Sequence, residues 1–78
     1  MKWKVEFKDI GRNKRSFTEV IAGNDEAPNH NKVARVAKST GGLLSRDVEA
    51  VSDPDSKEGI VIVGGFRTVG TFTYEPES

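Results

Sequence analysis

The chain has no cysteine and a single histidine, and its 12 acidic side chains balance its 12 basic ones over 78 residues. Without cysteine there are no disulfides, thiolate nucleophiles or thiolate metal sites, a composition typical of a reducing compartment. One histidine, His30, excludes a metal site built from several imidazoles. Because the formal net charge is zero, no overall field attracts nucleic acid or an anionic membrane. An electrostatic partner must therefore recognise a local patch.

Long apolar segments are also missing. The longest apolar run, Ile60 to Val63, is far shorter than the ~20 residues that a membrane-spanning helix needs. The N-terminal Met-Lys-Trp-Lys lacks the apolar stretch of a signal peptide. We therefore expect a cytoplasmic protein with no membrane partner. A chain of this length holds one hydrophobic core, so we expect a single domain over residues 1–75 and a short polar tail over residues 76–78.

Hydrophobic periodicity predicts an α+β domain with the order β-β-α-β-β-β. Residues 2–8 alternate between apolar and charged side chains, as in a half-buried strand. Further strands are expected over residues 16–22, 43–51, 60–63 and 66–74. Gly64-Gly65 favours a two-residue type I′ turn before the last strand, and Gly70 permits a slipped register with Phe66-Arg67 at the tip. The sequence thus predicts one helix packed on a mostly antiparallel five-stranded sheet.

The only segment with helical periodicity covers residues 28–40. Acidic residues precede it, and Gly41-Gly42 follows it, as expected for a helix that ends in a left-handed residue. At about 100° per residue, one arc of this helix is apolar and is expected to face the sheet; it consists of Val33, Ala34, Val36 and Ala37. The opposite arc carries Lys32, Arg35 and Lys38, a pattern more typical of a solvated face than of a binding site.

The order of the strands also predicts where charges gather. If the chain reverses direction at each turn, cations from the first loop, the end of the helix and the last hairpin lie at one end of the sheet. Acidic residues gather at the other end, namely Asp25, Glu26, Asp53, Asp55, Glu58 and Glu75. A basic end can contact phosphates or an acidic protein despite zero net charge. This predicts, as an alternative function, nucleic-acid binding through Arg12, Lys14, Arg15, Arg35 and Lys38.

A second clue is that residues 60–63 are apolar on both faces of their strand, whereas one helix covers only one face of a sheet. Either the sheet curls into a small roll, or apolar surface stays exposed and marks a protein partner or a second copy. Our main prediction is a non-enzymatic domain that binds or regulates another protein, or dimerises, through an exposed sheet face or hairpin. The predicted contact residues are Val61, Val63, Phe66 and Arg67.

No catalytic or cofactor motif is complete. The acidic run at residues 53–58 has proline second and lysine fifth, and it lacks the glycine that a calcium loop requires at its sixth position. His30 with a serine and Asp53 or Asp55 matches a catalytic triad in composition alone. The glycines near Lys38 follow a helix instead of preceding one, so they do not form a phosphate-binding loop. We therefore expect no enzymatic activity, no cofactor and no metal.

Overall fold

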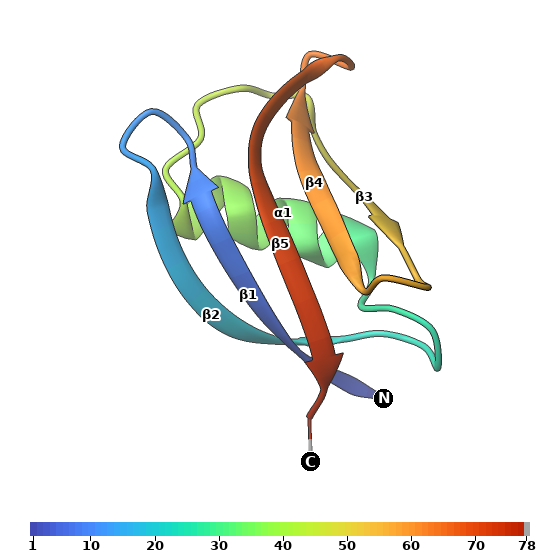
Figure 1. The fold of residues 1–78 in the computed structure, drawn as a ribbon. Helices are drawn as coiled ribbons and strands as arrows, with labels where there is room; N and C mark the ends of the chain where they lie inside the picture. The colour runs from blue at the N-terminus through green and yellow to red at the C-terminus, as the bar shows by residue number, and fades with distance from the viewer. Residues whose placement is uncertain (78) are drawn as a thin grey trace.

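The computed structural model describes residues 1–77 and confirms the β-β-α-β-β-β order (Figure 1). Five strands form one antiparallel sheet with the spatial order β2-β1-β5-β4-β3. The sheet is open, with β2 and β3 at its edges, so the alternative of a closed roll is wrong. The elements are β1 (Lys2–Ile10), β2 (Arg15–Ala22), α1 (His30–Thr40), β3 (Val48–Asp53), β4 (Glu58–Val63) and β5 (Arg67–Pro76).

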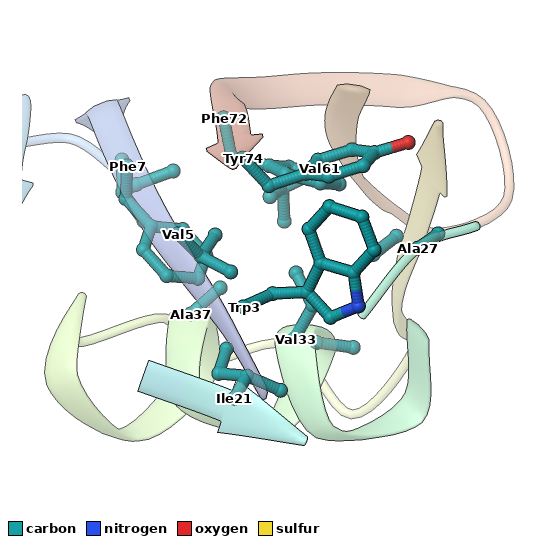
Figure 2. Packing of buried hydrophobic residues seen from close by; sticks show 13 residues of the cluster. Trp3, Val5, Phe7, Ile21, Ala27, Val33, Ala37, Val61, Phe72 and Tyr74 are labelled. Atoms are coloured by element: carbon teal, nitrogen blue, oxygen red, sulfur yellow. The ribbon is translucent and has the colours of Figure 1, made fainter. Parts of the chain in front are cut away.

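The core lies between α1 and one face of the sheet, here called the inner face (Figure 2). Alternate residues of the central strands point into it, and the helix supplies small side chains that let it approach the sheet closely. From the helix, Val33, Ala34 and Ala37 are buried as predicted, and Val36 is half-buried. The main sheet contributions are Trp3, Val5, Phe7, Val61, Phe72 and Tyr74.

The helix begins two residues later than predicted, because Asn29 acts as its N-cap. The Asn29 Oδ1 atom accepts hydrogen bonds from the backbone N–H groups of Asn31 and Lys32, at 3.0 and 3.2 Å. This cap satisfies donors that have no partner inside the helix. At the other end, the Gly41 N–H donates to the Ala37 carbonyl at 3.0 Å. Among residues 1–77, no helix has the length and apolar character that a bilayer crossing needs.

Several strand boundaries also differ from the prediction; for example, β1 continues to Ile10 and β4 begins at Glu58. The third strand begins at Val48, so residues 41–47 form a loop. In the last hairpin, Val63 pairs with Arg67, which leaves a three-residue connection in place of either predicted turn. Its two glycines have φ angles of 64° and 82°, a region that residues with a Cβ atom rarely adopt. The last strand continues to Pro76, which pairs with Trp3, so the predicted tail begins inside the sheet. Ser78 lies outside the described residues.

Candidate functional site

Three loops lie together at one end of the sheet: residues 11–14, 41–47 and 64–66 (Figure 1). Backbone hydrogen bonds hold the last two loops to each other and the first loop to β5, and Gly11 of the first loop packs closely against Gly41 and Leu43 of the second. The Gly11 N–H donates to the Val69 carbonyl at 2.9 Å, and the Gly64 N–H donates to the Asp47 carbonyl at 3.1 Å. These bonds join the first hairpin to the last strand, and the last hairpin to the loop before β3. The three loops therefore form one platform.

Six exposed cationic side chains surround this platform, which we call the basic end: Arg12, Lys14, Arg15, Lys38, Arg46 and Arg67. Within residues 1–77 the only ion pairs are Lys4 with Glu75, at 3.9 Å, and Lys8 with Glu6, at 4.0 Å. None of the six cations is therefore paired. Two carboxylates, Asp9 and Asp47, lie in or beside the same loops.

Four of the five residues predicted to bind nucleic acid lie at the basic end, and the fifth does not. Arg35 is exposed but sits halfway along α1, away from the helix C-terminus. The structure adds Arg46, which sequence reasoning missed because the loop around it was predicted to be a strand. Arg15 also reaches the end of the helix, where its Nη1 donates to the Thr40 carbonyl at 3.4 Å.

The opposite end is acidic, as the alternation of strand direction predicted. Its exposed carboxylates come from the loop before α1, the hairpin that joins β3 to β4 and the last residues of β5. They are Asp25, Glu26, Asp53, Asp55, Glu58 and Glu75. The separation of charge follows from the antiparallel order of the strands. Because the chain reverses direction at each turn, successive loops lie at alternate ends of the sheet, and the basic loops fall at one end and the acidic loops at the other.

Two large apolar side chains stand on the platform almost fully exposed to water. Phe66, at the tip of the last hairpin, is 89% exposed, and Leu44, in the loop before β3, is 97% exposed. The chain has five other aromatic residues; Phe17 is half-buried, and the rest are buried. They are Trp3, Phe7, Phe17, Phe72 and Tyr74. Phe66 was predicted to be a contact residue, whereas Leu44 was missed.

A second surface lies on the face of the sheet that the helix leaves uncovered, here called the outer face. Strand alternation turns Ile60 and Ile62 towards it, and Val51 of β3 pairs directly with Ile60. We call these three side chains the outer patch. Acidic residues lie around the patch, since Glu49 pairs with Ile62 and Asp53 pairs with Glu58. A groove beside Ile60 is lined in part by Lys8, Thr71 and Thr73.

The predicted protein contact residues do not form one surface. Val61 is fully buried under α1, so its place in an exposed contact is wrong. Val63 is half-buried and lies on the same side of β4 as Val61, while Phe66 and Arg67 belong to the basic end. The sequence could not separate the two faces, because all four residues from 60 to 63 are apolar.

His30, Ser52 and Tyr74 form a hydrogen-bonded chain near the acidic end. The His30 Nε2 and Ser52 Oγ atoms are 2.7 Å apart, and the Tyr74 hydroxyl donates to Ser52 Oγ at 3.2 Å. In a nucleophile–base pair, a third group orients the base. Within residues 1–77 no side chain bonds the other ring nitrogen of His30, and no cluster of metal-binding side chains occurs. The chain of bonds fastens the start of α1 to β3 and β5.

Comparison with protein-family models, with curated proteins and with solved structures found no match to this chain. The role of each residue must therefore be argued from the geometry of the two surfaces.

Proposed function

We propose that the protein is a small, non-enzymatic binding domain that captures an extended segment of another protein along the edge of β3. The observation that carries this proposal is the outer patch. Val51, on the edge strand itself, keeps half of its surface exposed although it pairs with Ile60 in the sheet. An apolar surface left open beside a strand edge favours a partner that covers it.

The edge of β3 is suited to an added strand. In the part of the chain that the structure describes, only β4 pairs with β3, so the backbone groups on the other side of β3 lack strand partners. Proteins often protect such edges with lysine, proline or a bulge. Residues 48–53 contain neither lysine nor proline, and their pairing with β4 runs without a break in register. An extended peptide could therefore continue the sheet, as in other cases of β-augmentation.

The outer face of β3 also predicts what the captured segment contains. Glu49, Val51 and Asp53 follow one another on this face, so an added strand meets an acid, an apolar residue and an acid at alternate positions. Facing cross-strand pairs of opposite charge and paired apolar side chains stabilise a sheet. We therefore expect a segment with lysine or arginine on both sides of an apolar residue, each two positions away from it.

Selection from a displayed library of random peptides tests this function. We expect enriched peptides to show the alternating basic and apolar pattern and to bind the wild-type chain. Val51→Glu should abolish this binding, because it places a carboxylate in the apolar contact between two acids. Val20→Glu is the matched control, since Val20 lies on the other edge strand and is 51% exposed, against 50% for Val51.

Failure to enrich such peptides, or equal binding by the Val51→Glu variant, would contradict the proposal. Size-exclusion chromatography with light scattering tests whether the edge of β3 binds another protein or a second copy of the chain. If the wild-type chain forms a dimer that Val51→Glu disrupts, the edge binds a second copy and not another protein. We place this function in the cytoplasm, a location that the absence of cysteine supports.

The alternative, nucleic-acid binding at the basic end, has less support. Proteins that bind single strands combine a cationic groove with several aromatic side chains on which successive bases stack. Within residues 1–77, Phe66 is the one exposed aromatic side chain. The uncovered outer face carries threonines and paired charges in place of aromatic rings, because the rings of the central strands point into the core.

A further inference from the structure

The basic end combines two properties that the outer patch lacks. Phe66 and Leu44 project from separate loops and are almost fully exposed, although each has a large apolar surface that water solvates poorly. The backbone bond from Gly64 to Asp47 joins the two loops, so both side chains are presented by the same platform. Unpaired arginines and lysines surround them.

From these features we propose that the basic end binds an anionic membrane surface. Phe66 and Leu44 enter the interfacial region of the lipid, and the surrounding cations contact lipid phosphates. This combination of side chains favours binding at a membrane interface, because burial of apolar side chains adds to electrostatic attraction by anionic headgroups. This inference concerns a different surface from the edge of β3 and does not depend on the proposed function.

Zero net charge does not oppose such binding, because the acidic side chains lie far from the basic end. β5 runs from the basic end to the acidic end in ten residues, about 30 Å of extended chain. At physiological ionic strength, electrostatic interactions in water are screened over about 8 Å. When the basic end touches a membrane, the carboxylates at the other end therefore contribute little repulsion, and their position favours one orientation of the molecule.

The geometry favours lipid over the other anionic partners. Leu44 has no π face on which a base can stack, and among the described residues no second exposed aromatic side chain lies beside Phe66. Residues that dominate protein–protein contacts sit within a patch whose neighbours exclude water. Phe66 and Leu44 instead stand on separate loops with little cover from their neighbours. The expectation of no membrane partner came from the lack of long apolar runs and from the zero net charge. Binding at the basic end would depart from it, because a summed charge does not record how the fold separates its charges.

A tryptophan introduced at position 66 tests insertion directly. Phe66→Trp places an indole at the tip of the hairpin, while Trp3, the natural tryptophan, is 1% exposed and contributes a constant background. With vesicles of mixed phosphatidylserine and phosphatidylcholine, we expect a blue shift of the emission and quenching by lipids brominated in their acyl chains. Vesicles of phosphatidylcholine alone should produce neither change. Val20→Trp, on the outer face of the other edge, should report no insertion into either vesicle.

Vesicle sedimentation separates insertion from simple charge attraction. The Leu44→Ser/Phe66→Ser variant should bind mixed vesicles at least about tenfold more weakly than the wild-type chain, because the loss of two buried apolar side chains exceeds the energy of a tenfold change. Replacing Arg12, Lys14 and Arg15 by serine should also weaken binding and reduce its dependence on salt. Val51→Ser should bind like the wild-type chain, which keeps this test independent of the β3 edge.

Three results would overturn the inference. The first is no binding to mixed vesicles at low salt. The second is equal binding by the Leu44→Ser/Phe66→Ser variant, which would mean that neither side chain enters the lipid. The third is displacement of the wild-type chain from vesicles by single-stranded oligonucleotide at equal phosphate concentration, together with quenching of the Phe66→Trp emission. That result would assign the basic end to nucleic acid.

Discussion

Replacement of Trp3 by phenylalanine tests the account of the core most directly. Trp3, on β1, is buried in the core between the sheet and α1, and its ring meets the ring of Tyr74 edge to face, with centroids 5.4 Å apart (Figure 2). Its indole N–H donates to the Asn24 carbonyl at 2.8 Å, which ties the loop before α1 to the first strand. Trp3→Phe keeps one aromatic ring and removes both the hydrogen bond and part of the ring system.

The expected cost is the sum of these two losses. A typical hydrogen bond contributes about 1 kcal/mol to stability. Trp3→Phe also removes two buried carbon atoms besides the indole nitrogen, which costs about 2 kcal/mol with the cavity that they leave. We therefore expect Trp3→Phe to lower the free energy of unfolding by about 3 kcal/mol, a large part of the 5–15 kcal/mol typical of a domain.

Urea denaturation followed by circular dichroism measures this change without relying on the fluorescence of the residue that is replaced. With a slope of about 1–1.5 kcal/mol per molar urea, the midpoint should fall by roughly 2–3 M. Phe66→Leu is the control, because it also trims an aromatic ring but at an exposed position; it should change stability by less than about 0.5 kcal/mol. A loss below about 1 kcal/mol for Trp3→Phe would refute the reasoning.

Three further variants test other features of the fold. Val61→Glu should leave the chain unfolded by circular dichroism, because it buries a carboxylate with no partner, whereas Ile60→Glu on the outer face should fold; two folded variants would contradict the assignment of faces. Asn29→Ala should cost about 1 kcal/mol in urea denaturation, because it removes the helix cap, and an unchanged midpoint would contradict that role. Gly59→Ala should lower thermal stability by about 1–3 kcal/mol, because its Cβ atom would lie 2.6 Å from the Val51 carbonyl oxygen; an unchanged melting temperature would contradict this close approach.

The fold class was readable from the sequence because its signals are local. Apolar and charged residues alternate from Lys2 to Lys8, which follows the two-residue period of a strand with one wet face. The helix has the 3.6-residue period and the two glycines that end it. These patterns depend on residues close together in the chain and not on tertiary contacts. The order of the elements and the buried arc of the helix could therefore both be predicted.

The bounds of the strands, and the face of the sheet on which each residue lies, were harder to predict from the sequence, because tertiary contacts decide them. Residues 43–47 resemble a strand in composition, but β4 can pair with β3 only from Val48 onward. The run from Ile60 to Val63 has no polar residue to mark its wet side, so the position of the helix alone determined that Val61 is buried and Ile60 is not. This explains why the protein contact residues were misassigned at Val61.

By itself, the sequence determined the number and order of the elements, the buried arc of the helix, and the antiparallel reversals that separate acidic from basic residues. The tertiary structure alone decided that the sheet stays open, that Val51 joins Ile60 on its uncovered face, and that Leu44 and Phe66 share one platform with the cations. The physical reason is the distance along the chain over which each kind of interaction acts. Periodicity and turns act between neighbouring residues, whereas a surface is assembled from side chains that come together only when distant segments pack.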